Sequence, residues 1–440
     1  MVDIATKEVL DKLPVAELED SLHTFLRPMM TVLPDKRLQE VVPLAVRGIL
    51  GSETPIVTHM AQTVARTESG VWAAAKRMYR FLDNERFNHL ELENGLYEIS
   101  QANIRQEDPA YGVVALDPVN FEKPYTTELE GVSIVHKSTP PQLNGQARLT
   151  RGYPAMTAMV VNTKIPAVTY ANWFSYTTDF LSENLEIKRA IVATRRLLPD
   201  YRLRFVADAG LDDQKLFKEL AKDEFVIRAS HLERLVEVYN DRLDRWESES
   251  LQDLVDVVPF THTFYVTFTH ARQTRLATIN IGWFRLRLPT THQPLWAVVA
   301  YEAALDRTLV LLTNVPLHSV KEVRSVYNDW RLRSRIEHGY RFDQEQGLNV
   351  EDMRVQTLER MKRLFFLVLA AAQFVFYLIN TWPPAAVRWI RELGGKLGLV
   401  NDLDGPYLVL RGLSALLQTV ATLTFLAICP FPRGETSTYG

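Results

Sequence analysis

Cysteine is almost missing from this sequence. It occurs once in 440 residues, as Cys429. A disulfide framework and a cysteine-ligated metal cluster are therefore excluded. The sequence also has no glycine-rich phosphate loop, no His/Cys spacing typical of zinc sites and no convincing internal repeat. Its first residues, MVDIATKEVLDKL, lack the apolar stretch of a secretory signal. We expect a cytoplasmic protein.

An excess of charge of one sign is also missing. Lysine and arginine number 50 and aspartate and glutamate 53, so the net charge is -3. No global positive field indicates a nucleic-acid-binding protein, although a local basic groove is compatible with this total. Apolar residues make up 47% of the chain and charged residues 23%, which is typical of a folded soluble protein with a large core.

Long uninterrupted hydrophobic runs are scarce. Residues 364–382 are nearly all apolar but include Gln373 and Asn380, and residues 412–429 carry one amide and several hydroxyl side chains. Both runs are at the short end of a membrane-spanning length, and amide side chains are costly in lipid. We expect two buried core helices, and a membrane-associated protein is the distant alternative.

The rest of the chain divides by hydrophobic periodicity. Residues 1–105 repeat apolar positions every three or four residues, which predicts helices. Residues 106–254 combine β-branched and aromatic runs with helical stretches, which predicts an α/β sheet. Residues 255–315 alternate apolar and polar positions, as antiparallel strands do. Residues 316–382 and 383–440 return to helical periodicity.

Two buried apolar runs each lead directly into an aspartate. Asp117 follows Val-Val-Ala-Leu and precedes Pro118, while Asp208 follows Phe-Val-Ala and precedes Ala-Gly210. A strand buried on both faces that ends in an acid places that acid at the edge of a sheet. For Asp117 by itself, a loop-capping aspartate is the alternative explanation.

One predicted helix is rich in charged and aromatic residues, SVKEVRSVYNDWRLRSRIEHGYRFDQE. Trp330, Arg333 and Glu337 are spaced three and four residues apart and share a helix face, which Arg341 and Gln344 continue. Exposed i,i+4 ion pairs are the alternative explanation for this charge. Two aspartates and one such glutamate can hold two divalent cations about 3.5–4 Å apart for phosphoryl transfer. Oxygen ligands favour Mg²⁺ or Mn²⁺.

The chain resembles the cut-and-paste DDE transposases of bacterial insertion sequences, in the insertion-sequence-four group. The resemblance rests on LDPVNFEK with Asp117, VADAG with Asp208 and YNDWRLRSRIEHGYRFDQEQGL with Glu337, and it covers about residues 75–375. It implies an α/β fold with a ribonuclease-H-like core, here 106–254 and 316–382. It also implies a β-rich insertion, here 255–315, and flanking helical regions, of which 1–105 binds DNA.

The family signature in the third stretch reads Tyr, two residues, Arg, three residues, Glu, six residues, Lys. Arg333 and Glu337 match it, whereas Trp330 stands where the family has Tyr and Gln344 where it has Lys. The tryptophan keeps a flat ring. The missing lysine removes a phosphate contact that Arg341, about one turn earlier, is placed to supply.

The resemblance also implies an activity and its partners. The enzyme would cut double-stranded DNA at transposon ends and join the freed 3′-hydroxyl to target DNA. Two Mg²⁺ (or Mn²⁺) ions would be held by Asp117, Asp208 and Glu337, in a homodimer on paired ends near the bacterial nucleoid, with no membrane partner. Members of the group can form a hairpin end with one base flipped onto an aromatic ring, a role for which Trp283 and Trp296 are candidates, although core packing explains either. A host-retained nuclease or DNA-binding derivative is the nearer alternative.

Two basic clusters are further candidates for phosphate contacts. In the first, basic and aromatic residues interleave from Lys76 to Phe81, which indicates either a DNA-contacting helix face or a solvated helix with a buried aromatic stripe. The second consists of four arginines, Arg195, Arg196, Arg202 and Arg204.

Overall fold

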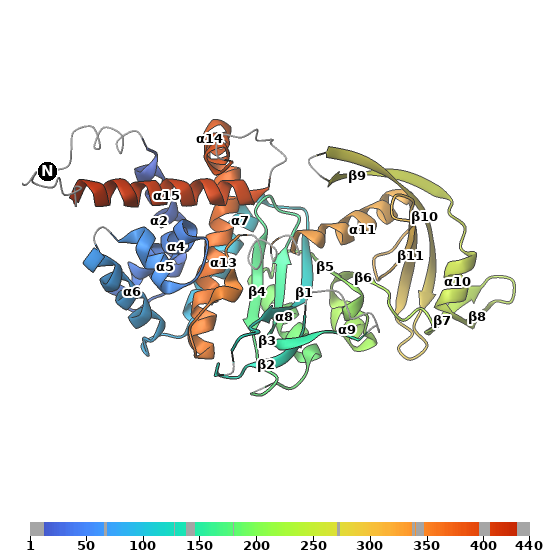
Figure 1. Ribbon diagram of the computed structural model, residues 1–440. Helices are drawn as coiled ribbons and strands as arrows, with labels where there is room; N and C mark the ends of the chain where they lie inside the picture. The colour runs from blue at the N-terminus through green and yellow to red at the C-terminus, as the bar shows by residue number, and fades with distance from the viewer. Residues whose placement is uncertain are drawn as a thin grey trace, which may run out of the picture. The chain divides into compact units, whose positions relative to one another are not determined.

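The computed structural model describes residues 13–65, 68–126, 128–137, 146–178, 180–270, 273–336, 339, 347–395 and 405–428. The chain divides into two compact units, each built from discontinuous segments (Figure 1). The first unit falls within residues 1–99, 122–132 and 339–440, and the second within 100–121 and 133–338.

The first unit is helical where it is described. It contains α2 (Val15–Thr31), α3 (Lys36–Gln39), α4 (Val41–Ser52), α5 (Val57–Val64), α6 (Glu68–Leu82), the turn η3 (Val350–Asp352), α13 (Leu358–Thr381), α14 (Pro384–Gly394) and α15 (Pro406–Ile428), and α7 (His89–Glu107) begins in it. Helix α13 is buried on most of its circumference because it contacts α2, α4, α6, α14 and α15. The sequence-based division assigned α13 to residues 316–382 of the catalytic core. In the structure it packs with the N-terminal helices instead.

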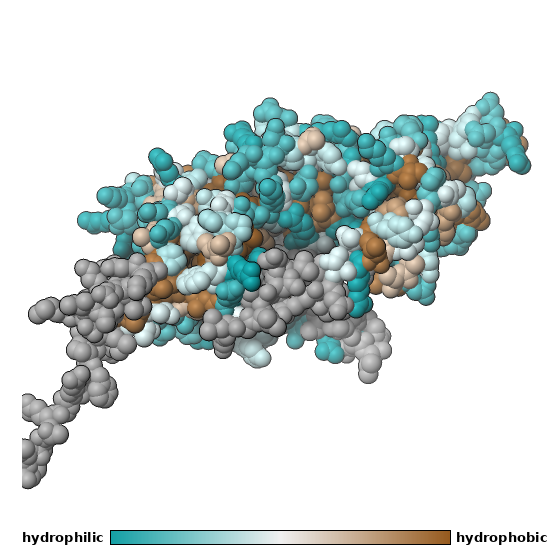
Figure 2. Space-filling view, turned by 90° about the horizontal axis from the view of Figure 1, so that it is seen from above, coloured by the Kyte–Doolittle hydropathy of each residue, from teal (hydrophilic) through white to brown (hydrophobic). Residues whose placement is uncertain are grey.

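Among the residues that the structure describes, two helices are long and apolar enough to cross a bilayer, Leu358–Thr381 and Pro406–Thr424. In the most apolar window of the first, 72% of the residues are buried within the protein, against 39% in the second. The exposed residues of the second helix are polar, namely Arg411, Gln418, Thr419 and Thr422. Figure 2 shows one face of the molecule, where hydrophilic side chains predominate and apolar ones form separate patches. These features favour core helices over lipid-facing spans.

Twelve strands of the described chain form one sheet in the second unit, and the fold is mixed α/β. They are β1 (Gly112–Glu122), β2 (Ser133–His136), β3 (Leu149–Val160), β4 (Ala167–Trp173), β5 (Leu203–Ala207), β6 (Glu224–Arg228), β7 (Leu235–Asn240), β8 (Arg245–Ser250), β9 (His262–His270), β10 (Gln273–Arg287), β11 (Pro294–Glu302) and β12 (Arg307–Thr313). The order is β2-β3-β1-β5-β6-β12-β11-β10-β7-β8, with β4 beside β3 and β9 beside β10. Strands β1, β5 and β6 are parallel, whereas the pairs among β6 to β12 are antiparallel.

Short helices connect and cover these strands. They are α8 (Glu183–Leu197), η1 (Ala209–Leu211), α9 (Gln214–Glu219), η2 (Leu220–Lys222), α10 (Leu251–Val257) and α11 (Val320–Leu332). Helix α8 begins after Ser182, whose hydroxyl accepts a hydrogen bond from the backbone N–H of Leu185, and it packs on β3 and β4. All five residues of β5 are buried, as expected for a central parallel strand.

Two strand predictions require correction. Strand β1 does not end at Asp117 but continues through Pro118 to Glu122. Its partner β5 has already ended at Ala207, so the missing N–H of Pro118 breaks no bond to β5. Two antiparallel strands within residues 235–250 also precede the predicted β-rich region 255–315, because β7 pairs with β8 and with β10.

The predicted helix that carries Arg333 and Glu337 is also not continuous. Helix α11 ends at Leu332, and Arg333 forms a turn before helical backbone resumes at 334–336. The N–H of Arg333 bonds the carbonyl of Trp330, three residues earlier, and the Ser334 hydroxyl donates to the carbonyl of Arg331 at 3.0 Å. Such short-range bonds tighten the last turn of a helix and bend it.

Candidate functional site

The two predicted aspartates occupy neighbouring positions in the sheet. Leu116 of β1 is in register with Ala207 of β5, and the next residues along these parallel strands are Asp117 and Asp208. Adjacent strands lie about 4.8 Å apart. Two residues that are 91 positions apart in the sequence therefore lie at neighbouring positions along the sheet.

A third strand continues this row with a basic residue. Ala207 is in register with Ile227 of β6, so Arg228 follows on the other side of Asp208. The guanidinium of Arg228 lies 3.5 Å from one carboxylate oxygen of Asp208, and that of Arg333 lies 3.8 Å from the other. Both separations exceed those of a strong charge-assisted hydrogen bond. The carboxylate of Asp208, which is 37% exposed, is therefore only loosely held by these arginines.

Helix α11 is fixed to β5 next to this row. It begins with a capping box, in which the Ser319 hydroxyl accepts from the N–H of Glu322 and the Glu322 carboxylate accepts from the N–H of Ser319. Near its end the indole N–H of Trp330 donates to the carbonyl of Ala207 at 3.0 Å. Trp330, a predicted DNA contact, thus also ties the helix to the strand that carries Asp208.

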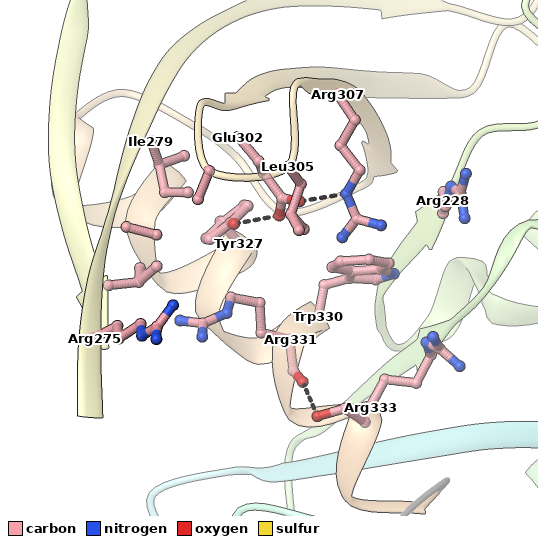
Figure 3. A pocket seen from close by; sticks show the side chains of 14 residues that line it. Arg228, Arg275, Ile279, Glu302, Leu305, Arg307, Tyr327, Trp330, Arg331 and Arg333 are labelled. Atoms are coloured by element: carbon pink, nitrogen blue, oxygen red, sulfur yellow. Dashed lines mark hydrogen bonds and ion pairs between the residues drawn. The ribbon is translucent and has the colours of Figure 1, made fainter. Parts of the chain in front are cut away.

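A cavity of about 590 Å³ opens beside these residues, bounded by β9, β10, the β11–β12 connection and α11 (Figure 3). Five arginines line it, and we name it the arginine cavity: Arg228, Arg275, Arg307, Arg331 and Arg333. The ring of Trp330 lies among them, and the guanidinium carbon of Arg333 is 5.7 Å from its centre. Apolar side chains such as Val266 and Ile279 complete the wall. A cavity of this composition suits a ligand with both negative charge and a flat apolar face.

Glu302 is the acidic residue in the described lining of the arginine cavity, and two neighbouring side chains bind its carboxylate. Glu302 accepts a hydrogen bond of 2.6 Å from the Tyr327 hydroxyl and forms an ion pair with Arg307. Burial and the hydrogen bond to Glu302 raise the pKa of Tyr327, so its hydroxyl remains a donor. The other four arginines of the described lining include Arg228 and Arg333, which pair with Asp208, so the lining is rich in guanidinium groups.

The predicted third acid lies outside the described residues. Glu337, Arg341 and Gln344 all belong to stretches that the structure leaves undescribed, so their predicted roles stay predictions. Within the described ranges, no group of three or more His, Cys, Asp or Glu side chains forms a metal site. Asp117 and Asp208 offer carboxylate oxygens, the ligand type that Mg²⁺ prefers. Arg333, four residues before Glu337 in the sequence, lies 3.8 Å from Asp208. The described donors therefore fit two ligands of the implied set.

The two candidate stacking residues lie elsewhere in the sheet. Trp283 of β10 is half-buried with its ring 5.5 Å from that of His262, and Trp296 of β11 is half-buried with its ring 5.8 Å from that of His318. Neither belongs to the residues that line the arginine cavity. Trp330 and Tyr327 are its aromatic residues.

Sequence reasoning missed most of the arginines of this cavity. Arg228 ends the apolar run of β6. An apolar run that leads into a charged residue is the same pattern that indicates Asp117 and Asp208. Arg275 and Arg307 are strand residues whose convergence depends on the pairing of β10, β11 and β12.

The second predicted basic cluster proves to be structural in part. Arg204 is buried and ion-paired with Glu224 and Asp329. Arg195 pairs with Asp223 and Glu219. Neither guanidinium is available to a DNA phosphate, because each is already engaged within the fold.

Comparisons with known proteins include a distant structural likeness. No family model matches the chain, and no curated protein matches it. Among solved structures, the chain is similar to the piggyBac transposase in a synaptic complex with hairpin DNA. The match has 9% sequence identity and a TM-score of 0.41, and it covers 95% of this chain and 80% of that chain.

Proposed function

We propose that the chain is a transposase that cuts DNA and joins the freed 3′-hydroxyl to a target by metal-dependent phosphoryl transfer. The observation that carries the proposal is the register of β1 and β5, in which Leu116 pairs with Ala207, the residues directly before Asp117 and Asp208. Mg²⁺ ions held by these carboxylates and by Glu337 would activate the attacking oxygen and stabilise the leaving one. The parallel order of β1, β5 and β6, with β3 and β4 beyond β1, supports a ribonuclease-H-like core.

The arginine cavity supports DNA as the substrate. Its guanidinium groups offer the planar donors that bind phosphate oxygens in pairs, and Trp330 offers a ring against which a base stacks. We infer that the guanidinium of Arg228, which is 43% exposed and lies 3.5 Å from Asp208, turns towards a phosphate when a strand is bound. The chain's own residues thereby align a phosphodiester with the two aspartates.

Helix α6 supports a second DNA contact, in the predicted DNA-binding region 1–105. Trp72 is 59% exposed, and the ammonium of Lys76 lies 5.4 Å from the centre of its ring. Tyr79 and Arg80 continue this exposed side, whereas Phe81 is buried. An exposed aromatic and basic face suits phosphates and bases. Binding to two paired DNA ends by a homodimer completes the proposal.

The test is strand cleavage and joining on DNA that flanks the gene, with Mg²⁺. We expect wild type to cleave and join, and Asp208→Ala to lose on the order of 10²–10³-fold in rate, because a group that stabilises the transition state is removed. Asp200→Ala is the matched control, since Asp200 is an exposed aspartate shortly before β5. A wild-type chain without cleavage would refute the proposal. Cleavage without joining would instead identify a nuclease derivative.

A further inference from the structure

A buried network of charged side chains lies within the second unit, along the strands that end at the site. Arg204, the second residue of β5, is 4% exposed. Its guanidinium donates to Glu224 at 2.8 Å, forms an ion pair with Asp329 and lies 4.7 Å from the ring centre of Tyr111. Asp329, also buried, accepts a hydrogen bond of 2.8 Å from the Tyr111 hydroxyl. The four side chains form one connected group.

Each member of this network belongs to an element that carries a site residue. Tyr111 directly precedes β1, Arg204 is in β5, Glu224 begins β6 and Asp329 is in α11. These elements lead to Asp117 in β1, to Asp208 directly after β5, to Arg228 at the end of β6, and to Trp330 in α11 with Arg333 directly after that helix. The network thus connects, away from Asp208, the elements that carry or directly precede these residues.

The energetics indicate a role other than stability. Burial raises the pKa of Asp329, and the charge of Arg204 opposes that rise, so the desolvation of these groups is only partly offset. A buried ion pair contributes little net stability compared with apolar residues of similar size, although removal of one partner alone is costly. What the pair does provide is one preferred alignment of the elements that carry it.

We propose that Arg204 and Asp329 are positioning residues, which set the register of α11 against β1, β5 and β6. This inference rests on the proposed function. With this register fixed, the indole N–H of Trp330 bonds the carbonyl of Ala207, and the guanidinium of Arg333 lies near the carboxylate of Asp208. Neither positioning residue touches the reacting atoms.

The decisive variant is the apolar pair Arg204→Met/Asp329→Leu, which removes both charges at similar volume. We expect its thermal unfolding to remain cooperative and near that of wild type, because no lone buried charge is left. We expect its affinity for Mn²⁺, measured by calorimetry without DNA, to fall about 10-fold or more, as when outer residues that orient metal ligands are changed. The Mg²⁺ concentration for half-maximal cleavage should rise in parallel. The matched control is Arg202→Met, an exposed arginine of the same region that also pairs with Glu224.

The outcomes separate the two proposals. A folded double variant with wild-type Mn²⁺ affinity and wild-type metal dependence of cleavage would overturn the positioning role. If the double variant does not fold, Asp329→Ala, which removes the bonds to Tyr111 and Arg204 but leaves Arg204 paired with Glu224, serves in its place with the same expected loss and the same overturning result. A wild-type chain that binds Mn²⁺ but cleaves no DNA refutes the transposase proposal alone, and the calorimetric comparison then still decides the positioning role. A wild-type chain that binds no Mn²⁺ refutes both.

Discussion

The indole N–H of Trp330 donates a 3.0 Å hydrogen bond to the carbonyl of Ala207, the residue directly before Asp208. One side chain therefore both lines the arginine cavity and holds the strand that presents a candidate metal ligand. This dual contact explains why a flat ring with a polar edge suits this position: a phenyl ring lacks the donor, and a phenol places its donor further out.

Replacement of Trp330 by phenylalanine tests that contact. The variant keeps a ring in the cavity but leaves the Ala207 carbonyl without this donor, so we expect a loss of about 1 kcal/mol in the free energy of unfolding. Urea denaturation measures the loss. Trp296→Phe, outside the cavity, is the control. Equal stability of wild type and Trp330→Phe would show that the bond does not hold the helix to the strand.

The salt dependence of DNA binding tests the arginine cavity. Arg275→Ala and Arg331→Ala remove charges that line the cavity without contact to Asp208. Each arginine that meets a phosphate should lower the slope of log affinity against log salt by about 1. Fluorescence anisotropy of a labelled duplex at several salt concentrations gives the slope. Arg388→Ala, an exposed arginine paired with Glu392 on α14, should leave it unchanged. An unchanged slope in both cavity variants would exclude this surface from DNA contact.

The exposed face of α6 makes a separate prediction. Lys76→Ala/Arg80→Ala should weaken binding to all DNA sequences about equally, because phosphate contacts carry no sequence information. Trp72→Ala should weaken binding further through the loss of about 1–3 kcal/mol of stacking, if a base lies on that ring. Gel-shift titrations on specific and scrambled duplexes measure both effects. Trp389→Ala, a comparably exposed tryptophan on α14, is the control, and an equal loss there would refute a role specific to α6.

The pH dependence of stability is predicted at Glu359 in the first unit. Burial raises its pKa, but hydrogen bonds and charge from His89 and Arg363 outweigh burial and lower the pKa from 4.5 to about 2. The folded-state pKa lies below the unfolded value, so the carboxylate stabilises the fold above about pH 4.5 and loses this effect as the pH falls towards about 2. Thermal unfolding temperatures should therefore fall more steeply with acid in wild type than in Glu359→Gln. Parallel curves would contradict this, and Glu392→Gln, in an exposed pair, is the control.

Local pattern alone predicted several elements of this fold. The run before Asp208 reads as a buried strand because all its residues are apolar, and β5 is buried throughout. The start of α11 was predicted at Ser319, where Ser and Glu322 form a capping box. These features depend on residues within a few positions of one another, which is the range over which sequence periodicity carries information.

The sequence by itself determined which acids directly follow buried apolar runs, and with them two candidate ligands, Asp117 and Asp208. The tertiary structure decided which residues meet there. The register of β1, β5 and β6 added Arg228 to the row, and the pairing of β9 to β12 gathered the other arginines around Trp330. The tertiary structure also pairs Arg204 with Asp329, which is 125 positions away along the chain, so this guanidinium is not available to DNA. Strand register and helix packing join residues that are distant in sequence, so no local pattern contains them.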